Sequence, residues 1–489
     1  MAKTISIFGT GSDVGKSLLT AGILRLLVQN GYAAAPFKAQ NMSNNSFVTK
    51  DGLEMGRAQV NQAHAAKIEP DVLMNPVLLK PSSDQTSQVI LMGKPQANLK
   101  ARDFLTHKLQ LKETALAAFA ELSKSHDYIV IEGAGSLAEV NLRERDIANM
   151  GLAQEIKSPV IMVADIDRGG VFAQIVGSLE VLSPEDRALI KGVIINRFRG
   201  DISLFESGKK WLEEKTGLPI LGIIPFFQGL KIPAEDSVSL ETITDLPQKK
   251  YHQKNIKKQV AIIKFPRISN FTDFEPLLFH EALDCHYLEE VRDLSSYDLL
   301  ILPGSKSTIN DLKWVKDSGW EDEIKAFHSL TKPILGVCGG FQMLGLEVLD
   351  PMQIESSQKE ATGLCLLPMT TEIQASKTLR QVEGNSTPYN CKITGYEIHQ
   401  GTSKFTENVA PFYFVSGEPK GLYNSKKRII GTYLHGIFND PNFLNKFLQL
   451  ELGLPPNLTT QVDPYDKLAK ELAPHLDLEK LIKILEDST

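Results

Sequence analysis

A single cysteine flanked by glycines is the clearest candidate nucleophile in this chain. Cys338 follows the apolar run Ile334–Val337 and precedes Gly339, Gly340 and a helix-like apolar pattern. Glycines allow a sharp strand-to-helix turn, from which a side chain projects beside backbone N–H groups that can stabilise an anion. A buried structural cysteine is the simpler alternative. His435, which lies well downstream in a glycine-containing run, supplies a candidate base, so the pair predicts nucleophilic catalysis.

A second candidate site lies near the N-terminus, where a glycine-rich loop separates a strand pattern from a helix pattern. The loop reads Gly9-Thr10-Gly11-Ser12-Asp13-Val14-Gly15-Lys16-Ser17. In this context backbone N–H groups would surround phosphates, Lys16 would reach the β and γ oxygens, and the Ser17 hydroxyl would ligate Mg²⁺. The usual motif has a glycine where this chain has Thr10, with Gly9 and Gly11 on either side. The loop, with Gly11 and Gly15 as its key glycines, predicts nucleotide binding.

Polar residues follow several predicted strands at the point where each strand ends. They are Lys38 and Asn41 after the run ending at Phe37, Glu132 after Tyr128–Ile131, Asp165 and Arg168 after Val160–Ala164, and Asn196 after Gly192–Ile195. Ligands of parallel sheets collect at the carboxyl ends of strands, so these residues predict a face for substrate and nucleotide. Glu132 is suited to Mg²⁺ and Asn196 to a nucleobase edge. Turn chemistry explains any one of them equally well.

Two blocks of alternating strand and helix patterns position these residues. The strand runs are Ile5–Phe8, Tyr128–Ile131, Val160–Ala164, Gly192–Ile195, Ile220–Ile224, Gln259–Lys264, Leu299–Leu302, Ile334–Val337 and Ile429–Leu434. The alternation predicts an α/β protein with two doubly wound domains, each with a mostly parallel sheet. We place them at 1–240 and 259–450, joined by a polar, lysine-rich linker at 241–258 and followed by an amphipathic helical tail at 451–489. The lysines of the linker are better explained by solvation than by nucleic-acid binding.

Composition narrows the class of protein. The chain has 489 residues, a formal net charge of −6, 42% apolar residues and four cysteines. The charge gives no reason to expect nucleic acid or an anionic membrane as a partner, and the cysteines are too few and scattered for a disulfide framework. No run is long enough to cross a bilayer and no signal-peptide pattern is present, so the expected location is cytoplasmic.

Both halves resemble known enzyme families. The loop Gly9–Ser17 has the displaced-glycine spacing of dethiobiotin-synthetase-like P-loop ligases, and the second half resembles class I glutamine amidotransferases. With Asn41–Ser46, Asp165–Phe172, Gly395–His399 and Tyr433–Gly436, residues 4–450 are similar to the cobyric acid synthase family. The resemblance implies a ligase that uses ATP, Mg²⁺ and glutamine to amidate the b, d, e and g carboxylates of adenosylcobyrinic acid a,c-diamide. It implies a corrinoid substrate, neither nucleic acid nor membrane as partner, and a possible homo-oligomer.

The resemblance also implies roles for individual residues. Lys16, Ser17, Glu132 and Mg²⁺ would neutralise charge while a carboxylate is phosphorylated, with Glu54 as a second metal-side carboxylate. Candidates for holding phosphate or substrate carboxylates are Lys38, Asn41, Arg57, Asp165 and Arg168, although Arg57 could equally lie on a helix surface. Cys338 would attack the glutamine amide carbon and His435 would transfer the proton to ammonia. The oxyanion donors would be N–H groups of Gly339 and of the turn at Gly304.

The sequence departs from the general amidotransferase pattern beside the histidine. Most members have a glutamate two residues later, and this chain has Ile437. Either a Cys–His dyad suffices or another acid, such as Glu397, orients the ring; His399 is a less favoured rival base. Three other functions stay open: a cobyrinic acid a,c-diamide synthase, a glutamine-dependent ligase for another acid, and a regulatory P-loop ATPase with an inactive second domain.

Overall fold

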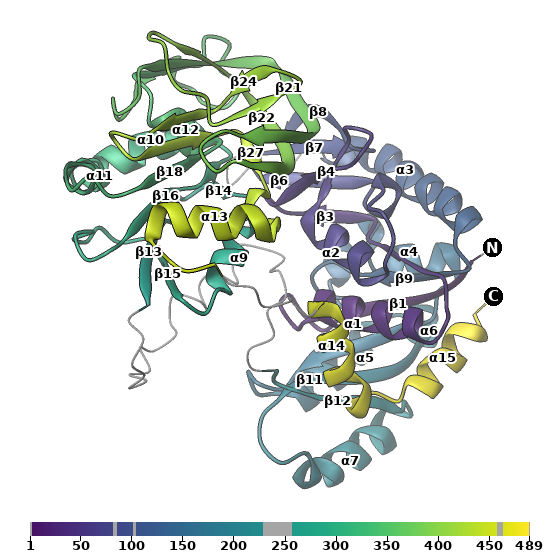
Figure 1. Cartoon of the computed structure of the whole chain (residues 1–489). Helices are drawn as coiled ribbons and strands as arrows, with labels where there is room; N and C mark the ends of the chain where they lie inside the picture. Colours follow the sequence, from purple (N-terminus) through teal and green to yellow (C-terminus); the bar gives the residue numbers. More distant parts are fainter. Residues whose placement is uncertain (1, 82–85, 101–103, 228–256, 457–462, 489) are drawn as a thin grey trace.

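The computed structural model describes residues 2–81, 86–100, 104–227, 257–456 and 463–488. Figure 1 shows two lobes, each built around its own sheet. The predicted linker at 241–258 lies outside the described residues except for Lys257 and Lys258. Among the helices of the described ranges, none has both the length and the apolar character needed to span a bilayer.

The first lobe contains a six-stranded parallel sheet with the order β12-β11-β10-β1-β9-β2. Its strands are β1 (Lys3–Gly9), β2 (Ala34–Phe37), β9 (Tyr128–Glu132), β10 (Val160–Asp165), β11 (Ile190–Phe198) and β12 (Ile220–Pro225). Apolar clusters cover both faces, one containing Phe8 and Ile129 and the other Ile7 and Leu24. The predicted α/β class and the parallel sheet are therefore confirmed for this lobe.

Helices and two small sheets complete the first lobe. The helices are α1 (Lys16–Gln29), α2 (Arg57–Ala65), α3 (Phe104–Ser125), α4 (Met150–Ile156), α5 (Val171–Val181), α6 (Pro184–Leu189) and α7 (Glu206–Thr216). The small sheets contain β3 (Gln40–Met42), β6 (Val77–Pro81), β7 (Thr86–Leu91) and β8 (Lys94–Lys100), and β4 (Ser46–Val48) with β5 (Glu54–Gly56). They lie on the side of the lobe that faces the second lobe (Figure 1).

The second lobe is built on a sheet with the order β15-β13-β16-β18-β26-β25, parallel except at β25. Its strands are β13 (Lys258–Ile263), β15 (Leu283–Leu288), β16 (Leu299–Leu302), β18 (Ile334–Val337), β25 (Leu422–Asn424) and β26 (Ile429–Thr432). The surrounding helices are α9 (Glu275–Leu278), α10 (Thr308–Asp317), α11 (Trp320–Ser329), α12 (Gly339–Met343) and α13 (Pro441–Leu452). This arrangement confirms the predicted second α/β unit.

A second, mostly antiparallel sheet in this lobe was not anticipated from the sequence. Its order is β20-β19-β21-β22-β27, and β23 and β24 extend it. The strands are β19 (Glu347–Leu349), β20 (Glu360–Thr362), β21 (Met369–Ser386), β22 (Cys391–Phe405), β23 (Tyr413–Val415), β24 (Glu418–Lys420) and β27 (Leu434–His435). The long β21–β22 hairpin brings Tyr396 opposite His435 in the strand register.

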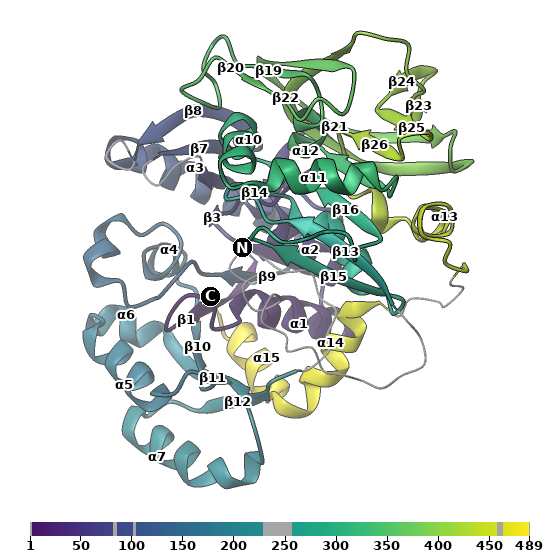
Figure 2. The same ribbon diagram turned by 90° about the vertical axis from the view of Figure 1, so that its left-hand side faces the viewer.

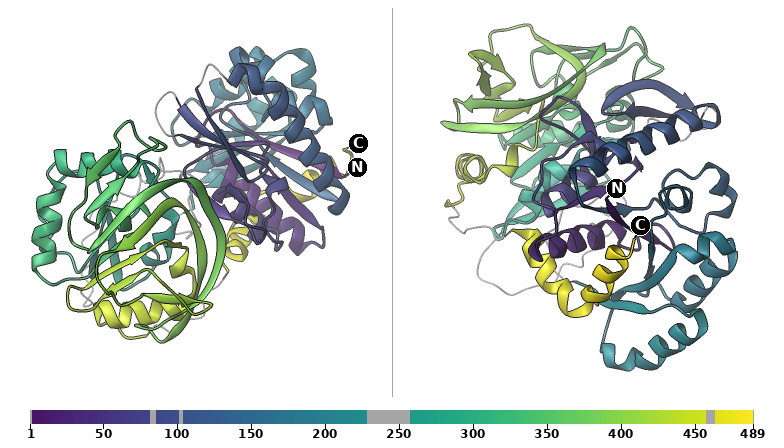
Figure 3. Two further views of the ribbon diagram at one scale, coloured as in Figure 1. Left: turned by 90° about the horizontal axis from the view of Figure 1, so that it is seen from above. Right: turned by 90° about the vertical axis from the view of Figure 1, so that its right-hand side faces the viewer.

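The C-terminal segment returns to the first lobe. Helices α14 (Pro464–Leu472) and α15 (Leu478–Glu486) lie beside α1 and β12, whereas α13 stays with the second lobe (Figures 1 and 2). The predicted apolar face is buried there, through Leu468, Leu472, Leu476, Leu481 and Leu485. Lys3 and Tyr128 both bond Glu486, so the two chain ends lie close together (Figure 3).

Candidate active sites

The glycine-rich loop is held in shape by its own lysine and by an asparagine from a neighbouring strand. Lys16 Nζ donates to the carbonyl oxygens of Gly11 at 2.8 Å and Gly135 at 2.9 Å. Asn196 Nδ2 donates to the Val14 carbonyl at 2.8 Å. Gly15 has a φ of 91°, and a Cβ there would come within 2.2 Å of Asn196 Nδ2. The loop therefore requires glycine at this position both for its conformation and for close packing.

Glu132, at the end of β9, contacts two of the groups expected around a phosphate, Ser17 and Lys38, and one further amide. Its carboxylate accepts from Ser17 Oγ at 2.7 Å and Lys38 Nζ at 2.8 Å, and it also bonds the Gln62 amide. Glu132 is fully buried. A hydroxyl and a carboxylate in contact beside two lysines are the donor set that a Mg²⁺–phosphate group uses.

A cavity of about 600 Å³ opens over this loop. It is lined by seven of the predicted residues, namely Gly15, Lys16, Ser17, Lys38, Asn41, Glu132 and Asn196. Phe226 and Phe227 follow β12 and provide an apolar wall, to which the C-terminal helix α14 adds Tyr465. The cavity thus combines a phosphate-binding end with aromatic surface that can contact a base.

Three predicted substrate or phosphate residues lie outside the lining of this cavity. Asp165 pairs with Arg197 at 2.9 Å and caps the turn by accepting from the Asp167 N–H. Arg168 is 65% exposed and lies 3.9 Å from Asp13. The Arg57 guanidinium lies 5.6 Å from the centre of the Phe47 ring. Asp165 therefore stabilises its own turn, and Arg57 is buried against Phe47 rather than lying on a helix surface.

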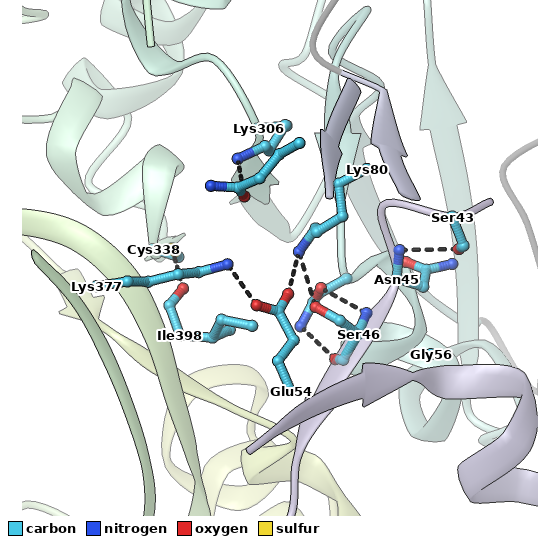
Figure 4. A network of polar contacts seen from close by, with 12 residues as sticks. Ser43, Asn45, Ser46, Glu54, Gly56, Lys80, Lys306, Cys338, Lys377 and Ile398 are labelled. Atoms are coloured by element: carbon cyan, nitrogen blue, oxygen red, sulfur yellow. Dashed lines mark hydrogen bonds and ion pairs between the residues drawn. The ribbon is translucent and has the colours of Figure 1, made fainter. Parts of the chain in front are cut away.

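Glu54 requires a correction, because its carboxylate is occupied by lysines. Oε1 accepts from Lys80 Nζ at 2.8 Å and Oε2 from Lys377 Nζ at 2.6 Å, with Glu54 fully buried between them (Figure 4). Burial alone would raise the pKa of Glu54, but the two ammonium groups lower it to well below its usual range. Two adjacent cations repel a metal ion, and Glu54 is not part of the nucleotide-cavity wall. We therefore withdraw the metal assignment.

Cys338 occupies a strained turn between β18 and the short helix α12. Its φ is 51° and its ψ is −109°, a conformation that non-glycine residues rarely adopt. The neighbouring glycines are required by close packing: a Cβ on Gly340 would lie 2.0 Å from the Leu302 carbonyl oxygen, and one on Gly336 2.6 Å from Leu344. Cys338 is buried but lines a cavity, and backbone strain at such a thiol is typical of a catalytic nucleophile.

The two predicted oxyanion turns face each other at this cysteine. Gly304 belongs to β17 (Gly304–Ser305), and a Cβ built on it would lie 3.5 Å from His435 Cε1. A Cβ built on Gly339 would lie 2.7 Å from the Ser305 nitrogen. The absence of a side chain at both glycines thus lets the two turns lie close together beside Cys338. We propose that their N–H groups stabilise the oxyanion.

An aspartate that the sequence analysis did not single out orients His435. Asp273, in the short helix η4 (Phe271–Phe274), lies with Oδ2 2.6 Å from His435 Nδ1, and its Oδ1 accepts from the Gly436 N–H at 2.9 Å. His435 Nε2 is buried with no hydrogen-bond partner among the described residues, and the ring lines the same cavity as Cys338. The group is therefore a Cys–His–Asp arrangement.

Electrostatics favour the protonated histidine. Burial lowers the pKa of His435, but Asp273 and the Cys338 sulfur outweigh it and raise the pKa to about 10. A protonated imidazole beside a sulfur stabilises the thiolate, which is the attacking species. The ring of Tyr396 stacks on that of His435, with centroids 5.5 Å apart, and limits its rotation.

The two alternatives weighed from sequence have other partners. Glu397 bonds Arg380 at 2.8 Å and receives the Tyr413 hydroxyl at 3.0 Å, so it does not orient His435. His399 stacks on Tyr433 at 3.9 Å and donates from Nδ1 to the Gly401 carbonyl at 2.8 Å. His399 lines the cysteine cavity, but these contacts fix its ring in the cavity wall. Asp273 carried no strand-end signal in the sequence, because it lies in η4, well beyond the end of β13 at Ile263.

The cavity at Cys338 is small, about 40 Å³, and its wall is charged. Lys306, Lys377 and Glu355 from the second lobe line it together with Lys80 from the first. Burial lowers the pKa of Lys80 to about 8 and that of Lys306 to about 7. Figure 4 shows Lys80 reaching from its strand to Glu54, which Lys377 of the second lobe also contacts. One wall of the second-lobe site therefore comes from the first lobe.

The segment after Lys38 forms the rest of this contact. Ser46 exchanges hydrogen bonds with Asn270, at 3.3 Å through its N–H and 3.1 Å through its carbonyl, and the carbonyl also accepts from the Tyr396 hydroxyl at 3.0 Å. Asn45 Oδ1 accepts from the Phe271 N–H at 3.2 Å. The run Asn41–Ser46 thus contacts both sites. Asn41 lines the nucleotide cavity, whereas Asn45 and Ser46 bond Phe271 and Asn270 at the start of η4, the helix that contains Asp273.

Comparisons with known proteins agree with this two-site organisation. Residues 5–240 match the model of the CobQ/CobB/MinD/ParA nucleotide binding domain, and residues 259–443 match the CobB/CobQ-like glutamine amidotransferase domain. The cobyric acid synthase of Chlorobaculum tepidum is 45% identical, covering 98% of this chain and 97% of that protein. Those of Vibrio vulnificus and Limosilactobacillus reuteri are 43% and 45% identical, covering 98% and 100% of this chain and 100% and 99% of theirs.

Proposed function

The chain belongs to the cobyric acid synthase family, and from this membership we propose that it converts adenosylcobyrinic acid a,c-diamide into adenosylcobyric acid. Four side-chain carboxylates, b, d, e and g, become carboxamides. Each amidation consumes one ATP and one glutamine.

The first lobe activates the carboxylate. A carboxylate does not react with ammonia directly, because oxide is a poor leaving group; transfer of the γ-phosphoryl group gives an acyl phosphate, from which ammonia displaces phosphate. Lys16 and Lys38 would stabilise the charge on the transferring phosphoryl group. Ser17 and Glu132 are the residues that would hold Mg²⁺, which would neutralise charge on the phosphates. The contact between Ser17 and Glu132 and the glycine-lined loop fit that group.

The second lobe supplies ammonia. The Cys338 thiolate attacks the amide carbon of glutamine, His435 gives its proton to the leaving nitrogen, and the thioester is hydrolysed to glutamate. Asp273 holds Nδ1 of the imidazole and so leaves Nε2 for proton transfer in the cavity that Cys338 also lines. Lys80, Lys306 and Lys377 are suited to the α-carboxylate of glutamine and Glu355 to its α-ammonium group.

One observation carries the proposal: a Cys–His–Asp site in one lobe has part of its wall, Lys80, supplied by the lobe that binds the nucleotide. In an isolated glutaminase or an isolated ATPase, no residue of one site would be expected to line the other. The shared wall is the arrangement expected where ammonia released in one site must be used in the other.

The test is the mass of the product. We expect the protein with adenosylcobyrinic acid a,c-diamide, ATP, Mg²⁺ and glutamine to add four amides. Cys338→Ala should form no product with glutamine and the same product with ammonium, because only the thiol is lost. No mass change with either nitrogen donor would overturn the proposal. Amidation of the a and c positions of cobyrinic acid instead would identify the diamide synthase reaction.

A further inference from the structure

A second, larger cavity adjoins the nucleotide cavity and has no role in the chemistry described so far. Its volume is about 910 Å³. It lies over β3, the short helix η2 (Val140–Arg145) and the end of α5, all in the first lobe. The cavity is therefore outside the Cys338 site and distinct from the aromatic part of the nucleotide cavity.

The wall of this cavity carries four large apolar side chains that are exposed to solvent. Met42, Val140, Leu142 and Val181 line it and are 59%, 55%, 48% and 51% exposed. Large apolar side chains gathered at one exposed concave site are typical of a ligand-binding surface. Leu111, Leu137, Ile147 and Leu182 continue the apolar lining below them.

Two acidic residues of the wall, Asp186 and Asp146, already have partners within the protein. Asp186 accepts from Arg143 Nε and Nη2 at 2.6 and 2.7 Å. Asp146 accepts from the N–H groups of Ala148, Asn149 and Gly151 at 2.7–2.9 Å. The exposed charges that remain are Arg145 and Glu139. Arg145 can pair with a ligand carboxylate and Glu139 can accept from a ligand carboxamide.

The two cavities meet at the phosphate end of the nucleotide site. Met42, Ala134 and Gly135 line both, and the Gly135 carbonyl accepts from Lys16 Nζ. A carboxylate on a ligand in the larger cavity would thus lie beside the lysine expected at the β and γ phosphates. This is the position that phosphoryl transfer to a carboxylate requires.

We propose that the larger cavity binds the corrin ring of the substrate, with Met42, Val140, Leu142 and Val181 against an apolar face of the ring and Arg145 at a peripheral carboxylate. The proposal rests on the function proposed above. An apolar wall also suits a reaction at four positions around one ring, because hydrophobic contact has no fixed direction and accepts the ring in more than one orientation. A wall of directional hydrogen bonds would fix a single carboxylate at the phosphate.

The test measures binding rather than turnover. Equilibrium dialysis of adenosylcobyrinic acid a,c-diamide against the full-length protein gives a Kd, since the corrin's visible absorbance reports its concentration. We expect Leu142→Asp to raise this Kd by about tenfold or more, because a carboxylate on the apolar wall must be desolvated and repels an acidic ligand. Leu204→Asp, at a residue 80% exposed and outside the cavity, is the matched control and should leave the Kd unchanged.

A second variant tests the charge. Arg145→Met should weaken binding of the substrate about fivefold and binding of the amidated product less, because four carboxylates have become amides. Wild-type binding with unchanged Kd values in both variants would overturn the cavity assignment and leave the proposed function standing. Failure of the wild-type protein to bind the corrinoid at all would overturn the proposed function, and the cavity assignment with it.

Discussion

At the scale of single residues, the Cys338 site depends on one aspartate that is distant in sequence. Asp273 holds both Nδ1 of His435 and the following backbone N–H, and so fixes the ring and the turn together. The glutamate expected two residues after the histidine would have come from the same segment as the base. Here Ile437 is buried instead, and the carboxylate arrives from η4. The site therefore still has a cysteine, a histidine and an acid, but the acid comes from a different segment of the chain.

We expect Asp273→Asn to lower glutamine hydrolysis by roughly 10²–10⁴-fold, because His435 loses the carboxylate that orients its ring and stabilises its protonated form. Amidation with ammonium should be retained, since the first lobe is unchanged. Steady-state rates with the two nitrogen donors measure both effects. Asp293→Asn, at an exposed aspartate of the same lobe, is the control. Equal loss with both donors would show that the variant disturbs the fold instead.

The same variant should change the dependence of stability on pH. The pKa of His435 rises from 6.5 to about 10 on folding, so its stabilising contribution is complete below pH 6.5 and is lost as the pH rises towards 10. The wild-type Tm should therefore fall more between pH 6.5 and 10 than that of Asp273→Asn. Parallel Tm curves would contradict the ion pair.

At the scale of elements, the β21–β22 hairpin and the C-terminal helices α14 and α15 stabilise different parts of the molecule. The β21–β22 hairpin places Tyr396 on the His435 ring and Lys377 on Glu54, so it connects the cysteine site with the interface. The tail covers α1 instead: Arg25, almost fully buried, bonds Asp463 and Asp466 at 2.9 and 2.6 Å. The tail is therefore an integral layer of the nucleotide lobe.

We expect Leu472→Ala to reduce the free energy of unfolding by about 2–4 kcal/mol, the cost of removing a fully buried leucine. Leu472 packs directly over Gly22 of α1, where a Cβ would approach its Cδ2 to 2.6 Å. Leu450→Ala on α13, 49% exposed, should change the free energy by about 0.5 kcal/mol or less. Urea denaturation compares the two. Equal effects would mean that the tail is not packed on α1.

At the scale of the whole molecule, the lobes are joined by polar contacts that also form the cysteine cavity. Glu54 and Lys80 come from the first lobe and Lys377 from the second, and all three are buried. Buried ion pairs add little net stability, but loss of one partner is costly because the other charge remains buried. The network is therefore suited to fixing the relative position of the lobes.

We expect Glu54→Gln to lower the number of amides formed per glutamine hydrolysed, by about threefold or more, because two buried ammonium groups then lack a counter-charge. Removing the carboxylate should also lower the pKa of Lys80 below its present value of about 8. Glu69→Gln, in the exposed Lys50–Glu69 pair, is the matched control. An unchanged ratio in Glu54→Gln would show that the network does not couple the two sites.

The features that depend on local pattern could be predicted without the structure. Period and turn residues predicted the strands that carry Glu132, Asp165 and Asn196 at or near their carboxyl ends, although β11 continues past Asn196 to Phe198. The glycine spacing predicted the strained turn at Cys338. These are local because backbone conformation at a glycine or a strand end depends on near neighbours in the chain.

The contacts between charged residues far apart in the chain could be seen only in the tertiary structure. Asp273 reaches His435, Glu54 binds two lysines instead of a metal ion, and Lys80 enters the cavity of the other lobe. Each contact joins segments far apart in the chain, and any of several acids had the right chemistry for each role. Burial then selects the pairing, because a charge removed from water is stable only beside its counter-charge.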